Sequence, residues 1–299
     1  MRYCKLRKED GGQIVSVVKE KFEAITKMKP PYYQPAKGSQ KAQAYAVCVD
    51  CDNPVVLVGF YSKRDENTRS NTPHPRHTQR QLEGLPAYNQ TAYDLCRYSK
   101  KREYDPHVKK TKLDDPLAQE IRRILVEHFD KVVYVMEKVT GFRYSEAWLE
   151  IILTNYLNMD GFNYVGASIE NLPWVLLHLS LNQKLYGRRI AKDSLFYELV
   201  KTHYKRAIFE YSKGSQFEKL TFSGYCDAHF AFIGHQSEPK NGEIVEKVTL
   251  CLWDEDKLLI EMPLIFDTDY FFALLEYERW ETSERGKQLK KLAYRLVNP

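Results

Sequence analysis

Two cysteines ahead of a short β-like segment, Cys48 and Cys51, have the spacing in this sequence that is best suited to metal chemistry. Two cysteines separated by two residues can both point at one metal ion when the backbone between them forms a tight turn. Such a turn needs a left-handed residue after the second cysteine, and Asp52 and Asn53 tolerate that conformation better than most residues do. A strand is expected to leave the turn at Pro54.

The remaining ligands of a four-coordinate site must come from elsewhere in the N-terminal part of the chain. Tetrahedral Zn²⁺ is the ion that thiolates and imidazoles typically hold together. Cys96 is the natural third ligand. Besides Cys48, Cys51 and Cys96, the first 110 residues contain only one other cysteine, Cys4. The fourth is a histidine between them, with His77 favoured over His74. The sequence therefore predicts a structural Zn²⁺ held by Cys48, Cys51, His77 and Cys96. Cys4 and His107 are alternative ligands.

This arrangement resembles zinc-ribbon modules over roughly residues 45–98. The first pair has the ordinary spacing of such modules, whereas a separated histidine and cysteine replace their second close pair. The resemblance implies a closed structural site, and no HExxH or HxE arrangement supplies the general base of a catalytic zinc. Two alternatives stay open: a redox pair, which would open a helix rather than a strand, and free thiols buried as small hydrophobic side chains.

The six cysteines of this 299-residue chain need a role other than disulfide bonding if the protein is cytoplasmic, because the cytosol keeps thiols reduced. The N-terminus is charged and is not followed by the apolar run of a signal peptide. No apolar run reaches the ~20 residues of a membrane-spanning helix. We therefore expect a cytoplasmic protein without a membrane partner.

Charge is unevenly distributed along the chain. Residues 1–219 carry 36 Lys and Arg against 26 Asp and Glu, whereas residues 220–299 carry 9 against 14. A basic surface attracts nucleic acid or another anionic partner, and the acidic end could bind a protein. An unevenly charged, merely solvated surface explains the same counts equally well.

Two basic segments interleave cations with aromatic rings, as phosphate contact plus base stacking requires. Residues 97–112 hold seven Lys and Arg against two acids, and residues 184–219 hold nine against four. The residues predicted to contact nucleic acid, either DNA or RNA, are Arg97, Tyr98, Lys100, Lys101, Arg102, Tyr104, Arg188 and Arg189. A linker or a solvated helix face would have the same composition.

The elements that must position these residues follow from hydrophobic periodicity, and they predict an α+β fold. An N-terminal zinc-binding module, residues 1–112, should hold a helix at 13–28, a β-like segment within 43–62, a loop or partly disordered stretch at 63–86 and a short helix at 87–98. Residues 113–215 should form a helical unit with helices near 116–139, 144–157, 171–185 and 193–212. Residues 216–299 should form a β-rich unit with a hairpin turn at 254–257 and a last helix at 268–296.

Catalytic motifs have less support. The segment from Arg123 to His128 resembles the Arg–His pair that helical RNases of the HEPN type carry on one helix, where both residues can act on a phosphate. The resemblance covers this one short match, and an amphipathic helix explains it too. No phosphate-binding loop, dinucleotide fingerprint, nucleophile elbow or kinase motif is present. We therefore expect a nucleic-acid-binding or nucleic-acid-associated protein with structural zinc; the alternatives are such an RNase and an adaptor that binds protein through the acidic end.

Overall fold

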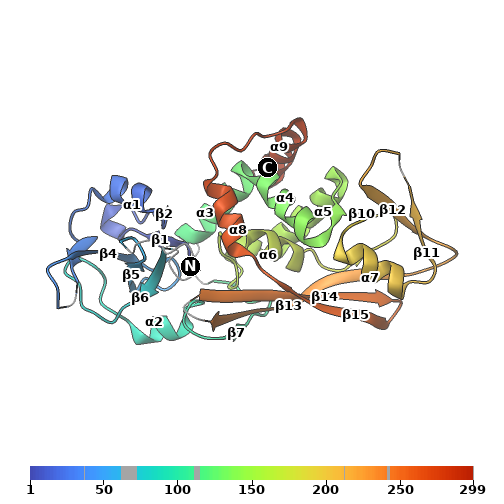
Figure 1. The fold of residues 1–299 in the computed structure, drawn as a ribbon. Coiled ribbons are helices and arrows are strands. Elements are labelled where there is room, and N and C mark those ends of the chain that lie inside the picture. Colours follow the sequence, from blue (N-terminus) through green and yellow to red (C-terminus); the bar gives the residue numbers. More distant parts are fainter. Residues whose placement is uncertain (37, 62–72, 111–114, 212, 241–242, 299) are drawn as a thin grey trace. The chain divides into compact units, whose positions relative to one another are not determined.

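The structure is a computed structural model that describes residues 1–36, 38–61, 73–110, 115–211, 213–240 and 243–298. The chain divides into two compact units. The first contains Met1–Arg102 together with Ser237–Val245, and the second contains Glu103–Gln236 and Glu246–Pro299. The three-part division at residues 112 and 215 stays a prediction about which parts fold independently. The predicted α+β class is confirmed, since helices and antiparallel sheets both contribute substantially (Figure 1).

The first unit is built on an antiparallel sheet of short strands. Its order is β2-β1-β4-β5-β6, and β3 pairs with β4. The strands are β1 (Tyr3–Lys5), β2 (Ile14–Ser16), β3 (Tyr33–Pro35), β4 (Ala42–Val47), β5 (Pro54–Val58) and β6 (His74–His77). Alternating residues of β4 and β5 point to opposite faces. Thus Ala44 and Leu57 join the cluster around Phe22 of α1 (Lys19–Thr26), whereas Tyr45 and Val56 pack with Leu82.

Predictions for the first unit are partly confirmed. The β-like segment expected within 43–62 is present and comprises two strands, β4 and β5, and the short helix expected within 87–98 is present as α2 (Gln90–Leu95). The helix expected at 13–28 begins only at Lys19, because Ile14–Ser16 pairs with β1 as a strand. The expected loop at 63–86 lies partly outside the described residues, and its later part contains β6, whose backbone pairs with β5.

Two further antiparallel sheets belong mainly to the second unit. One has the order β15-β14-β13-β7, with β9 also on β13, and the other has the order β11-β12-β10-β8. The strands of the first are β7 (Arg102–Glu103), β9 (Gln183–Lys184), β13 (Ala228–Lys240), β14 (Glu243–Asp254) and β15 (Lys257–Ile265). Those of the second are β8 (Phe142–Arg143), β10 (Arg189–Ala191), β11 (Ala207–Glu210) and β12 (Phe217–Phe222). The hairpin turn predicted at 254–257 is confirmed, because Asp254 pairs with Lys257 and Glu255 is left-handed at φ 53°.

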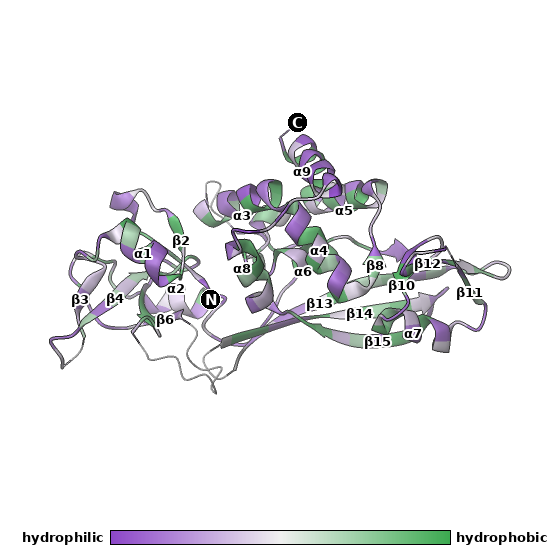
Figure 2. Cartoon of the chain, turned by 45° about the horizontal axis from the view of Figure 1, so that its top comes forward, coloured by the Kyte–Doolittle hydropathy of each residue, from purple (hydrophilic) through white to green (hydrophobic). Residues whose placement is uncertain are grey.

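Helices form the other layer of the second unit. The helix α9 (Glu284–Val297) lies against α3 (Pro116–Glu127), α4 (Phe129–Thr140) and α5 (Glu146–Asn158), as Figure 2 shows. The helix α6 (Leu172–His178) packs against α4 and α5, and the ring of its Trp174 stacks on Phe266 at 5.0 Å, next to the end of β15. Among the described residues, no helix combines the length and apolar character needed to cross a membrane.

The middle of the chain is less helical than predicted. The expected helix 116–139 is interrupted at His128, and short strands from β8 to β11 lie among the helices. The last helix is two helices, α8 (Thr268–Glu276) and α9. Lys131 explains this break, because its ammonium group donates to the carbonyls of Leu274 at 2.8 Å and Leu275 at 3.3 Å. These carbonyls belong to the last turn of α8, where no N–H group of the helix itself can donate to them.

Candidate metal centre

The hairpin of β4 and β5 closes with a tight turn, Cys48–Asn53, which we call the knuckle. The N–H of Cys48 donates to the carbonyl of Asn53 at 2.8 Å. Asp52 has the left-handed conformation expected of this position, with φ 60°, and its carboxylate pairs with Lys5. This turn brings Cys51 back toward Cys48.

Strand pairing and one helix position the other two candidate ligands. In the antiparallel register of β5 and β6, His77 lies opposite Val55, beside the knuckle, whereas His74 lies opposite Val58 at the far end of the strand. The register therefore selects His77 over His74. Cys96 is the residue that caps the C-terminus of α2, so its thiol reaches the knuckle from a third element.

The ligand atoms of Cys48, Cys51, His77 and Cys96 all lie within 4.8 Å of one another. The Sγ atoms of Cys48 and Cys96 are 3.8 Å apart, and His77 Nε2 is 3.3 Å from Cys51 Sγ and 3.7 Å from Cys96 Sγ. Tetrahedral geometry with Zn–S bonds of about 2.3 Å and Zn–N bonds of about 2.0 Å gives ligand separations of about 3.5–3.8 Å. The group could therefore hold a metal ion.

Burial and mutual hydrogen bonding perturb the thiols. Hydrogen bonds from the Cys48 and Cys96 thiols hold the pKa of Cys51 well below its usual range. Burial raises the pKa of Cys48, and hydrogen bonding with Cys48 and Cys51, together with burial, raises that of Cys96. A cluster with one favoured thiolate and two further thiols beside it would gain from a cation that stabilises all three as thiolates.

Polar contacts around the knuckle were not foreseen from the sequence. Asn53, only 1% exposed, donates from Nδ2 to Cys51 Sγ at 3.3 Å and to the carbonyl of Asn89 at 3.0 Å, and its Oδ1 accepts from Asn89 N–H at 2.6 Å. The ring of Tyr93 meets His77 edge-on at 5.0 Å. Hydrogen bonds and ring contacts of this kind orient metal ligands. The adjacency of Asn53 to Cys51 is visible in the sequence, but its pairing with Asn89 is not.

The first basic segment has a mixed environment. Arg97 and Tyr104 are buried, at 2% and 7% exposure, and Arg102 donates to the carbonyls of Asp94 and Cys96. Lys100 and Lys101 are exposed, and Tyr98 is half-buried. The described part of the predicted segment therefore offers the exposed Lys100 and Lys101 to a partner, whereas Arg97 and Tyr104 are buried and the half-buried Arg102 is held by backbone carbonyls.

The second basic segment lies on the short sheet of the second unit. The guanidinium of Arg188 lies 3.7 Å from the centre of the Trp148 ring, and burial lowers its pKa. Arg189 is exposed, within β10.

The Arg–His pair of the RNase alternative does not lie on one helix. The helix α3 ends at Glu127, and His128 adopts φ −126° between α3 and α4. Arg123 pairs with Glu120 at 2.6 Å and also with Glu127. The single-helix arrangement expected from the sequence is therefore wrong.

A buried polar network in the second unit was also missed by sequence analysis. Tyr164 Oη and His235 Nδ1 are 2.9 Å apart, His235 Nε2 is 3.3 Å from Glu246 Oε2, and Asn171 Nδ2 donates to the same oxygen at 2.6 Å. Gly166 is required beside it, since a Cβ there would meet Tyr164 and His235 at under 3 Å. These residues are far apart in sequence, so no local pattern reveals them.

No family model matches this chain, and no curated protein or solved structure is significantly similar to it.

Proposed function

We propose that Cys48, Cys51, His77 and Cys96 hold one structural Zn²⁺. The observation that supports it most strongly is the set of ligand separations, which are 3.3–3.8 Å for three of the six pairs and within 4.8 Å for all of them, close to those of tetrahedral coordination. Three thiolates with one imidazole favour zinc over the hard cations, which prefer oxygen ligands. Four protein ligands leave no coordination position open for a substrate, as expected of a structural rather than a catalytic site.

Two matched pairs of variants test the zinc proposal. Cys48→Ser should lose the metal, whereas Cys4→Ser should keep it, because Cys4 is equally buried but its Sγ faces the carbonyl of Val15 at 3.7 Å. His77→Ala and His74→Ala form the second pair, with loss expected only for His77. The measurement is the zinc content of purified protein by elemental analysis, and we expect one ion per chain in the wild type.

A wild-type protein free of zinc after purification without chelators, and unable to take it up, would contradict the proposal. Equal zinc content in Cys48→Ser and Cys4→Ser would do the same.

We infer further that the chain binds nucleic acid. The support is electrostatic: an excess of cations in residues 1–219 and the exposed Lys100 and Lys101 close behind Cys96. A bound zinc would hold the start of this segment rigid, and a rigid segment loses less conformational freedom on binding. The Arg97 and Tyr104 side chains are buried. Within this segment, the residues proposed to contact nucleic acid are therefore Lys100 and Lys101, with Tyr98 beside them.

Salt dependence tests this inference. Affinity for a short single strand should fall as salt rises, and Lys100→Ala/Lys101→Ala should flatten the log–log slope by about 0.7 per lost phosphate contact. Lys8→Ala/Lys29→Ala, which removes two exposed lysines elsewhere in the first unit, is the control. RNA, DNA and duplex arms identify the preferred form. A wild-type protein that binds none of them at low salt would refute nucleic-acid binding.

A further inference from the structure

The short sheet of the second unit has one covered face. In its register Ile190 lies opposite Phe142 on one side and Glu218 on the other, so these three side chains share a face. The helix α7 (Leu195–His203) covers it, because the rings of Phe196 and Phe142 are 4.4 Å apart and Tyr197 Oη donates to Glu218 at 2.8 Å. The neighbouring positions in each strand must face the opposite way.

The opposite face carries a row of three cations. Arg189 of β10 lies directly opposite Arg143 of β8 and Lys219 of β12. Side chains opposite one another across antiparallel strands have Cβ atoms only about 4.5–5.5 Å apart, and like charges in that arrangement are destabilising. The row therefore places like charges side by side, and an anion bound along it would reduce their repulsion.

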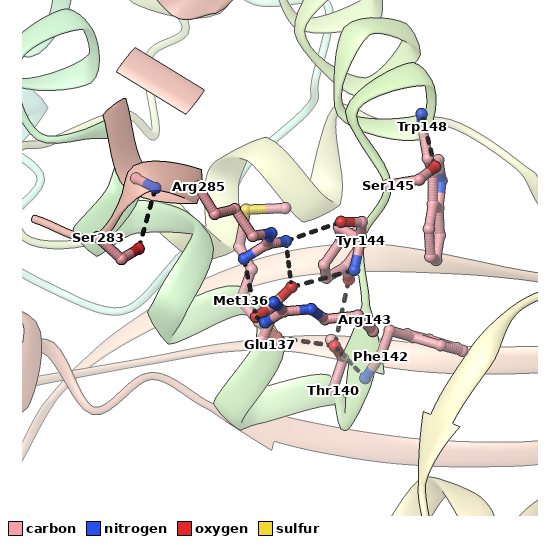
Figure 3. A network of polar contacts seen from close by, with 11 residues as sticks. Met136, Glu137, Thr140, Phe142, Arg143, Tyr144, Ser145, Trp148, Ser283 and Arg285 are labelled. Atoms are coloured by element: carbon pink, nitrogen blue, oxygen red, sulfur yellow. Dashed lines mark hydrogen bonds and ion pairs between the residues drawn. The ribbon is translucent and has the colours of Figure 1, made fainter. Parts of the chain in front are cut away.

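Two of the three cations have acidic neighbours, and the middle one does not. Arg143 Nη1 contacts Glu137 Oε2 at 2.8 Å, as Figure 3 shows, and Lys219 Nζ lies 3.4 Å from Glu210. Arg189 is exposed and forms no ion pair with the described residues. It is the cation most available to an external phosphate.

An aromatic ring lies in the same surface. Phe217 precedes Lys219 by two residues in β12 and so shares its face, and the Arg143 guanidinium lies 5.7 Å from the centre of its ring. Phe217 is partly exposed. Ile208, which is 47% exposed, lies opposite Thr221 on this face and adds apolar area beside the cations.

We propose that this open face, defined by Arg143, Arg189, Phe217 and Lys219, binds a single-stranded nucleic acid, with the cations on phosphates and Phe217 stacked on a base. The proposal rests on the nucleic-acid binding proposed above and places a contact in the second unit. Sheets that present rings between cations suit single strands, whose bases are free to stack. A duplex groove fits less well, because four strands about 4.8 Å apart span about 14 Å, wider than the ~12 Å major groove.

The test uses the full-length protein and a short fluorescent oligouridylate or oligothymidylate. Arg189→Gln/Lys219→Gln should flatten the log–log salt slope by about 1.4, which corresponds to two phosphate contacts at about 0.7 each. Lys287→Gln/Lys291→Gln is the matched control, since it removes two exposed lysines from α9 of the same unit and should leave the slope unchanged. Arg143 is left intact because it also holds Glu137.

Phe217→Leu separates stacking from charge. It should weaken binding by about tenfold and leave the salt slope unchanged, because stacking releases no counterions. Thermal unfolding checks that the variants fold, and Arg189→Gln/Lys219→Gln should unfold at a temperature close to that of wild type, because it removes both the repulsion along the row and the exposed ion pair between Lys219 and Glu210.

Unchanged affinity and slope in Arg189→Gln/Lys219→Gln would overturn this proposal, and nucleic-acid binding would stand if Lys100→Ala/Lys101→Ala still weakened it. Failure of the wild type to bind any single strand would overturn both. A different outcome is that the protein binds polyglutamate as tightly as the oligonucleotide, with no loss of affinity in Phe217→Leu. That result would identify an acidic protein as the partner and would also overturn this proposal.

Discussion

Asn53 joins two parts of the candidate metal centre. Its amide hydrogen-bonds to the sulfur of Cys51 and to both backbone groups of Asn89, the residue that caps the N-terminus of α2. Since Cys96 caps the other end of α2, the hydrogen bonds of Asn53 connect the proposed ligands Cys51 and Cys96, which are remote in sequence. Side chains that orient ligands in this way commonly affect metal affinity nearly as much as the ligands do.

Asn53→Ala should therefore weaken zinc binding by about 10–100-fold and destabilise the protein by about 1 kcal/mol, because the part-buried N–H and carbonyl of Asn89 lose their hydrogen-bond partner. Asn89→Ala is the control. It keeps the backbone groups that Asn53 holds and removes only the side-chain cap on Ala92 N–H, worth about 1 kcal/mol. Competition with a chromophoric chelator measures the affinity, and equal affinities in the two variants would show that Asn53 has no role in positioning ligands.

At this scale the sequence was informative where chemistry is local. The spacing of Cys48 and Cys51 and the left-handed Asp52 follow from adjacent residues, and the group Cys48, Cys51, His77 and Cys96 is the one that the fold brings together. The row formed by Arg143, Arg189 and Lys219 could not be predicted, because it exists only through the register of three strands.

Among the elements, prediction succeeded where a periodic segment was long. The β14–β15 hairpin and α5 were recognisable, whereas β2, β6, β8 and β10 have four residues or fewer, too few to show a period of two. Helix ends that depend on residues distant in the sequence could not be predicted either. Lys131, which contacts the carbonyls at the end of α8, lies more than 140 positions earlier in the chain.

The junction of α4 and α7 gives a prediction at the same scale. Gly141 ends α4 with φ +73°, and a Cβ there would collide with the side chain of Ser194, which caps α7. Gly187 has a similar φ of +78° with open space around it. Gly187→Ala should cost about 1–2 kcal/mol of left-handed strain, and Gly141→Ala about 1–3 kcal/mol more from overpacking.

Chemical denaturation of both variants, followed by circular dichroism, measures the difference. Equal unfolding midpoints would mean that Ser194 moves aside without cost.

For the molecule as a whole, we expect metal removal to affect the two units differently. Bound zinc can contribute about 10 kcal/mol or more to the folding of a small module, and all four proposed ligands belong to the first unit. A strong chelator should therefore make residues 1–102 sensitive to protease while the helices of the second unit stay resistant. Limited proteolysis with mass spectrometry identifies the cleavage sites, and added Zn²⁺ should restore protection. Equal sensitivity of both units would contradict a locally structural metal.

The first unit is discontinuous, since Ser237–Val245 belongs to it along with Met1–Arg102. A ribosome delivers the chain from the N-terminus, and domains generally fold as units during synthesis. The proposed zinc ligands are all synthesised by residue 96, but the last segment of their unit emerges about 140 residues later, which is several seconds or more at typical rates of elongation. During that interval the nascent chain would have its proposed metal ligands and the strands of its sheet complete but its unit incomplete, so early zinc capture would add to the sheet and the hydrophobic core in holding the first hundred residues together until their last segment is made.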